Sequence, residues 1–140
     1  MKSIMDEITK SEKKHRGEIR FAVEASLDIP VLLAGQTARD RAIDVFSQLR
    51  VWDTEENTGI LVYLLMSEHD IEIIADRGIN KAVGPGVWDK VCFDMEKLFR
   101  EGQFEEGVKN GIRDITVLLE KHFPHNGDDI NELPDRPVIL

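Results

Sequence analysis

Hydrophobic and polar residues alternate along residues 18–27, EIRFAVEASL. Ile19, Phe21, Val23 and Ala25 fall on one side of an extended chain, and charged residues fill most of the other side. A period of two, with aromatic and β-branched residues, predicts a β-strand. Its charged second face predicts an edge or half-exposed position in a sheet.

An uninterrupted apolar run, GILVYLLM at residues 59–66, predicts a second strand. A strand that is apolar on both faces is typical of the centre of a sheet covered on both sides. The polar segment SEHD, residues 67–70, predicts a short hairpin loop into a third strand over residues 71–75. The third strand is therefore expected to run antiparallel to the second.

Apolar residues at helical spacing predict helices over residues 3–14, 38–49, 88–99 and 104–119. The second of these begins with a pattern that resembles a capping box, Thr37 followed by Asp40. Because this helix joins the first two strands, a right-handed β-α-β crossover with parallel strands is expected. Gly107 and Gly111, one turn apart on the last helix, predict close packing against a neighbouring backbone.

These elements together predict an α/β fold. We expect a compact αβα sandwich in which a small mixed β-sheet, made of a parallel β-α-β unit plus an antiparallel hairpin, is flanked by helices. Residues 1–123 are expected to form a single domain. Residues 124–140, rich in proline and acids, are expected to form an extended C-terminal tail.

Charge and cysteine content narrow the classes of function. The chain has 140 residues with 27 acids against 18 bases, a formal net charge of −9, which disfavours nucleic-acid binding. No apolar run approaches the roughly 18 to 20 residues that span a bilayer, so membrane insertion is not expected. The N-terminus is not expected to be a signal peptide, because acids are interleaved with its apolar residues, and the single Cys92 agrees with a reducing compartment. A cytoplasmic location is therefore expected.

Polar side chains gather at both ends of the expected sheet. Asp76 ends the third strand beside Arg77, and it is expected near Asp53 and Asn57, which precede the second strand. Carboxylate and amide oxygens of this kind suit Ca²⁺ or Mg²⁺. The alternative is that these acids only end elements, accept backbone hydrogen bonds or pair with arginines.

The opposite end collects Asp28, Glu68 and Asp70. Ligands in open α/β sheets usually bind beyond the carboxyl ends of the parallel strands, and this rule favours the second cluster. The first cluster offers more convergent polar residue types. Spacing alone leaves both open as divalent-cation sites.

Other reactive residues are isolated in the sequence. DDINE in the tail lacks the alternating ligands of an EF-hand loop, and the histidines lack zinc-site spacing. Cys92 lies on the apolar stripe of its helix and is expected to be a buried thiol rather than a nucleophile.

Four phrases, RGEIRFAVEASL, NTGILVYLL, EIIADRGI and LFREGQFEEGV, together resemble the TPM domain family, which includes plant thylakoid and photosystem-repair proteins. Small bacterial members also carry VWDTE and the ELPDRPV tail. The resemblance runs from about residue 15 to residue 123 and implies an α/β sandwich. It also implies links to calcium binding, to acid phosphatase activity in a plant branch, and to LemA-like or membrane-anchored TPM relatives as partners.

We therefore expect a non-enzymatic binding or accessory module for a membrane- or envelope-associated partner, located in the cytoplasm or held at the inner membrane through that partner. The alternatives are a calcium-binding regulatory module and a divalent-metal-dependent phosphatase. The tail is the expected partner-binding segment. Its expected contact residues are Glu132, Leu133, Pro134, Asp135, Arg136 and Pro137.

Overall fold

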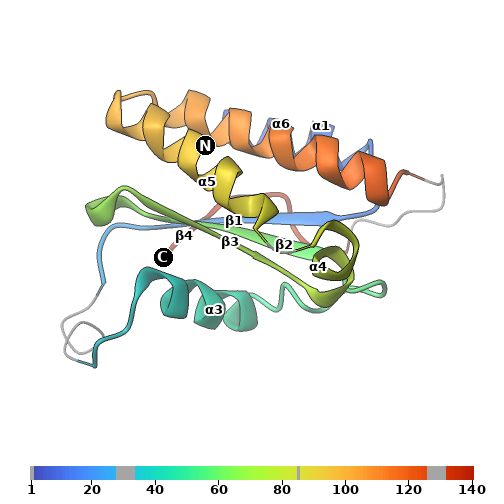
Figure 1. Cartoon of the computed structure of the whole chain (residues 1–140), viewed down its shortest axis with the longest axis horizontal. Coiled ribbons are helices and arrows are strands. Elements are labelled where there is room, and N and C mark those ends of the chain that lie inside the picture. The colour runs from blue at the N-terminus through green and yellow to red at the C-terminus, as the bar shows by residue number, and fades with distance from the viewer. Residues whose placement is uncertain (1, 28–33, 85, 126–131) are drawn as a thin grey trace.

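Three layers make up the computed structural model, which describes residues 2–27, 34–84, 86–125 and 132–140 (Figure 1). The helices are α1 (Lys2–Glu12), α3 (Ala38–Gln48), α4 (Arg77–Val83), α5 (Val87–Arg100) and α6 (Phe104–His122), with a 3-10 turn, η1, at Met66–Glu68. The strands are β1 (Glu18–Glu24), β2 (Gly59–Leu65), β3 (Asp70–Ala75) and β4 (Val138–Ile139). The predicted αβα sandwich is confirmed.

The strands form one mixed sheet in the order β3-β2-β1-β4. β1 runs parallel to β2 and to β4, and β2 runs antiparallel to β3. The β-α-β unit and the hairpin thus have the predicted arrangement. The hairpin turns through η1 and His69, whose φ of 50° places it in the left-handed region.

Each face of the sheet has its own hydrophobic core. α1, α5 and α6 cover the face that carries Ile19, Phe21 and Val62, whereas α3 covers the face that carries Ala22 and Tyr63 (Figure 1). The seven residues of β2 are all buried, as expected for a central strand. The glycines of α6 pack closely, as predicted, but against side chains of α5 rather than its backbone: a Cβ on Gly111 would lie 2.3 Å from Sδ of Met95.

One helix was not predicted, and one prediction about a strand was wrong. α4 begins immediately after Asp76, where no element was predicted from the sequence. β1 was expected at an edge or half exposed, yet it lies between β2 and β4, and its residues Glu18 and Ala22 are buried. The charged face of β1 is covered because the C-terminal segment folds back over it.

None of the helices in the described ranges has the length and hydropathy needed to cross a bilayer.

Candidate functional site

The predicted site residues at the Asp76 end of the sheet make structural contacts, and Oδ2 of Asp76 is buried with no hydrogen-bond partner among the described residues. Asp76 is the N-cap of α4, and its carboxylate accepts a 2.8 Å hydrogen bond from the N–H of Arg77. Asp53 instead pairs with Arg50 at 3.0 Å, and the main-chain oxygen of Asn57 accepts from the N–H of Gly78 at 2.9 Å. Asp53, Asn57 and Asp76 therefore each have a separate role in ending or joining elements.

Replacing Asp76 by alanine should lower the free energy of unfolding by about 1 kcal/mol, because α4 would lose the side chain that caps its first turn. Urea denaturation monitored by circular dichroism would measure this. Asp53→Ala is the matched control, since an exposed carboxylate paired with one arginine should leave stability within about 0.5 kcal/mol. Equal losses in the two variants would contradict the capping role.

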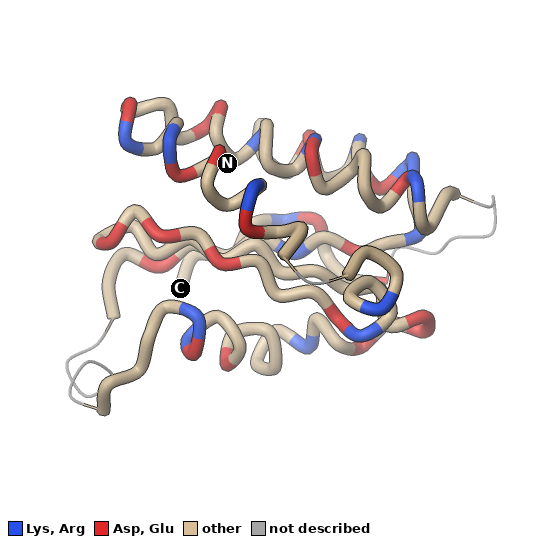
Figure 2. Tube along the Cα trace, in the orientation of Figure 1, with Lys and Arg blue, Asp and Glu red and all other residues tan. Residues whose placement is uncertain are grey.

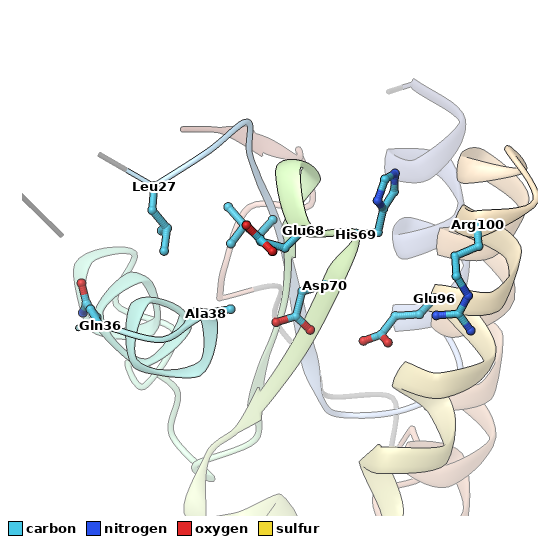
Figure 3. A pocket seen from close by; sticks show the side chains of 9 residues that line it. Leu27, Gln36, Ala38, Glu68, His69, Asp70, Glu96 and Arg100 are labelled. Atoms are coloured by element: carbon cyan, nitrogen blue, oxygen red, sulfur yellow. The ribbon is translucent and has the colours of Figure 1, made fainter. Parts of the chain in front are cut away.

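The opposite end contains an open hollow of about 490 Å³, here called the acidic pocket. Its polar lining residues are Gln36, Glu68, His69, Asp70, Glu96 and Arg100, and Leu27, Ala38 and Leu65 complete the wall. The hairpin supplies Glu68 and Asp70, and α5 supplies Glu96 and Arg100 (Figure 3). The carboxylates of Asp70 and Glu96 face each other across the hollow (Figure 3). Asp28, the third acid predicted for this end, lies outside the described residues.

Burial and repulsion from Asp70 raise the pKa of two carboxyl groups in and beside the acidic pocket. Burial and then repulsion from Asp70 raise the pKa of Glu72 to about 7, and Arg39 opposes this through a 3.4 Å ion pair. Burial, with a further contribution from Asp70, also raises the pKa of Glu96. The group therefore binds a proton more readily than isolated carboxylates do, and a bound cation would relieve the same repulsion.

Sequence reasoning missed Glu96, Arg100 and Glu72. Glu72 lies on β3, two residues from Asp70, so the alternation of the strand could have placed both on one face. Glu96 and Arg100 lie one turn apart on α5, and the sequence around them does not indicate that they lie beside the hairpin. Their position against the hairpin follows only from the packing of α5 on the sheet.

The predicted partner-binding tail is docked on the protein itself. The N–H groups of Glu132 and Leu133 donate to the carboxylate of Glu18, the latter at 3.3 Å. Leu133 is buried in the core beneath α3. Arg20 holds the next stretch by donating to the main-chain oxygens of Pro134 at 3.0 Å and Arg136 at 2.8 Å.

The end of the tail continues along the sheet. Asp135 accepts a 2.9 Å hydrogen bond from Thr9 of α1. Pro137 and Arg136 line a second hollow, about 570 Å³ in volume, beside Met5 and Ile139. The assignment of residues 132–137 to partner binding stays a prediction. The main chain of Glu132, Leu133, Pro134 and Arg136 already has partners within this protein.

The described part of the chain contains neither a preformed metal site nor an activated thiol. Within the described ranges, no three His, Cys, Asp or Glu side chains are arranged to hold a metal ion. Burial, followed by the nearby acids Glu72 and Glu96, raises the pKa of the Cys92 thiol to about 12. A thiol of this kind is a poor nucleophile at neutral pH.

A family model for the TPM domain matches residues 2–118 of the chain. The chain belongs to the TPM domain family. This TPM domain resembles the NMR structure of the BA42 protein from the psychrophilic bacterium Bizionia argentinensis, with 34% sequence identity and a TM-score of 0.86 over 99% of this chain and 91% of that one. A comparison with curated proteins found no match.

A second solved structure shares the fold of this TPM domain at lower identity. The solution NMR structure of the N-terminal domain of a protein from P. gingivalis is 18% identical, with a TM-score of 0.69 over 86% of this chain and 76% of that one. In this TPM domain, the fold places the acidic pocket at the hairpin end of the sheet and the docked tail over β1.

Proposed function

We propose that this TPM domain is a non-enzymatic binding module for a membrane- or envelope-associated partner, and that the acidic pocket holds a cationic group of that partner. The observation that carries the proposal is the pair of carboxylates, Asp70 and Glu96, that face each other across an open hollow of about 490 Å³. Two elements far apart in sequence supply them, and neither is used to cap a helix.

The chemistry of the pocket favours a cation over an anion or a neutral group. Asp70 repels both Glu72 and Glu96. Arg39, which lies outside the acidic pocket, pairs with Glu72, and Arg100 partly offsets the charge near Glu96. A lysine or arginine side chain of a partner would bring a positive charge between acids that now raise one another's pKa. The net charge of −9 would add a long-range attraction to a basic partner.

The class of partner comes from the family. The resemblance to small bacterial TPM proteins supports a LemA-like protein or a membrane-anchored TPM relative. Either would bring the domain to the inner membrane while the chain itself stays in the cytoplasm. The docked tail would then help to hold the sheet that carries the pocket.

A calcium-binding regulatory module is the second candidate, favoured by the same facing carboxylates. Their oxygens are the donors that Ca²⁺ and Mg²⁺ prefer. The described residues, however, supply no convergent set of three His, Cys, Asp or Glu ligands. The carboxylate oxygens are suitable ligands for a divalent ion, but too few of them converge on one point in the described residues. This candidate therefore ranks second. The phosphatase alternative rests on family resemblance alone.

Titration of the ¹⁵N-labelled protein with a hexalysine peptide amide at low salt tests the proposal. Amide shifts should be confined to residues 66–72 and to the second half of α5. The double variant Asp70→Asn, Glu96→Gln should weaken binding about tenfold, the equivalent of about 1.4 kcal/mol. The control Glu105→Gln, Glu106→Gln removes two exposed acids from the first turn of α6 and should change binding little.

A parallel titration with CaCl₂ separates the two candidates. Saturable shifts at the same residues at micromolar calcium would favour the regulatory module. Diffuse shifts with hexalysine, or equal weakening by the two double variants, would overturn the pocket as the binding site because charge alone would then explain the binding.

A further inference from the structure

β3 is an edge strand whose outward main-chain groups are bonded by side chains instead of another strand. It pairs with β2 on one side, and no described strand pairs with its other side. The N–H of Ile71 donates to Glu96 at 3.3 Å, the main-chain oxygen of Ile73 accepts from Arg39 at 3.2 Å, and that of Ala75 accepts from Asn80 at 2.8 Å. In an antiparallel pair, every second residue directs its N–H and C=O groups away from the partner strand. Ile71, Ile73 and Ala75 are such residues, and their outward groups form the free edge of β3.

Two of these three bonds are suited to exchange. The contacts made by Glu96 and Arg39 are at the long end of the hydrogen-bond range, and the Arg39 side chain is 57% exposed. Its ion pair with Glu72 is also long, at 3.4 Å. The main chain of an added strand could replace the bonds made by these two long, flexible side chains. The shorter bond from Asn80 to Ala75 would remain and would limit the added strand to the first part of β3.

Two hollows lie along this edge. The acidic pocket lies at the start of β3, and another hollow of about 540 Å³, here called the Trp88 hollow, lies beside Ile73, Asn80, Trp88 and Asp89. Both are bounded by α3 and by α5, which contact β3 from opposite faces of the sheet (Figure 1). The two hollows and the free edge of β3 are here together called the β3 groove.

Trp88 gives the β3 groove a buried donor in need of an acceptor. Its side chain is only 9% exposed, and its Nε1 is buried with no hydrogen-bond partner among the residues that the structure describes. A buried indole N–H ordinarily has an acceptor. Because Trp88 lines the Trp88 hollow, a main-chain carbonyl seated there could supply one after a small rotation of the ring exposes Nε1.

The charge of the β3 groove identifies the chemistry of its occupant. Glu68, Asp70, Glu72, Asp89 and Glu96 line the two hollows, against the two arginines Arg39 and Arg100. Acidic residues recur along the hairpin and β3 in the left-hand part of Figure 2. A second copy would bring its own acidic edge to this one, and like charges would oppose the contact.

We propose that the β3 groove binds an extended basic segment of the partner protein, which adds to β3 as a further strand. The inference rests on the proposed function and specifies how the partner binds. Main-chain hydrogen bonds to Ile71 and Ile73 would supply the register, and basic side chains would enter the acidic pocket. The indole N–H of Trp88 would bond a carbonyl of the segment.

The test uses the full chain and three six-residue peptides, acetylated and amidated, titrated at low salt. The first alternates Lys and Val, the second is the same peptide N-methylated at every residue, and the third alternates Glu and Val. The first should shift the amides of residues 70–74 and 86–89 and the Trp88 indole proton, and should slow hydrogen exchange at Ile73. The N-methylated peptide should bind at least tenfold more weakly, because it cannot complete the ladder, and the Glu peptide should not bind.

Variants of the two tryptophans test the donor. Trp88→Phe keeps an aromatic ring and should weaken binding of the Lys-Val peptide about fivefold. The matched variant Trp52→Phe, at the other end of the sheet, should leave binding unchanged. Thermal denaturation of both variants controls for folding.

The outcomes separate this inference from the proposed function. Equal binding of the plain and N-methylated peptides in the acidic pocket would overturn strand addition and leave the proposed function standing. Lack of binding by either basic peptide would overturn both. Concentration-dependent shifts of the β3 residues without any peptide would identify a second copy as the occupant and overturn the basic segment.

Discussion

Replacing Gly59 by alanine is expected to destabilise the protein by about 3 kcal/mol or more, with a fall in Tm of roughly 10 °C. Gly59 opens β2, and a Cβ at this position would lie 1.9 Å from the main-chain oxygen of Val51. Val51 is buried, and its N–H is bonded to the oxygen of Phe46 at 3.0 Å. The obstructing atom is therefore backbone held in place, and no side-chain rotation can relieve the overlap.

The control for this variant is Gly102→Ala. Gly102 has a φ of 78° and open space around its missing Cβ, so alanine there meets only backbone strain of about 1 kcal/mol. Urea denaturation of both variants would compare the two costs. A loss at Gly59 no larger than that at Gly102 would show that the β2 entrance can move, and the close approach to Val51 would not be a fixed feature of the fold.

The elements with strong periodicity were predictable from the sequence, and the short ones were not. The alternation in β1 indicates one apolar face that must be covered, and the apolar run of β2 indicates that both faces of the sheet are covered there. α4 has only seven residues and contains Gly78. Its place depends on tertiary contact, because a Cβ on Gly78 would lie 2.5 Å from the main-chain oxygen of Glu56. No local pattern encodes such an approach.

The candidate site was predictable to the same extent. The hairpin acids Glu68 and Asp70 could be placed at one end of the sheet from strand direction alone. Glu96 and Arg100 could not, because helical periodicity defines the buried face of α5 but not which loop lies beside its polar flank. The docking of the tail was equally hidden, since it depends on buried polar groups of β1 and not on apolar spacing.

Buried carboxyl groups beneath the tail are the source of a large pH effect. Glu12, at the end of α1, accepts a 2.6 Å hydrogen bond from the N–H of Ile19, and its Oε1 is buried without a partner in the described part of the chain. It faces Glu18 of β1 and Asp135 of the tail. Burial, then Asp135 and Glu18, strongly raise the pKa of Glu12, and burial raises the pKa of Glu18 to about 6.

The direction of the effect follows from these raised pKa values. The folded protein keeps protons that the unfolded chain releases above the ordinary carboxyl pKa of 4.5. The stability that these groups contribute is therefore fully present below pH 4.5 and is lost as the pH rises, first through about 6 for Glu18 and further for Glu12. Glu72, with its pKa raised to about 7, adds to the same trend.

Glu12→Gln is expected to stabilise the protein by about 2 kcal/mol at pH 8 and by much less at pH 5, because the amide needs no proton in the folded state. The amide oxygen can still accept from Ile19, and its N–H₂ can donate toward Glu18 or Asp135. Urea denaturation between pH 5 and pH 8 would measure both values, with Glu120→Gln, an exposed acid of α6, as the matched control. Parallel pH profiles for wild type and Glu12→Gln would contradict a proton held by Glu12 in the folded state. If Glu12 had the same pKa in the folded and unfolded states, its removal would not change how the free energy of unfolding depends on pH.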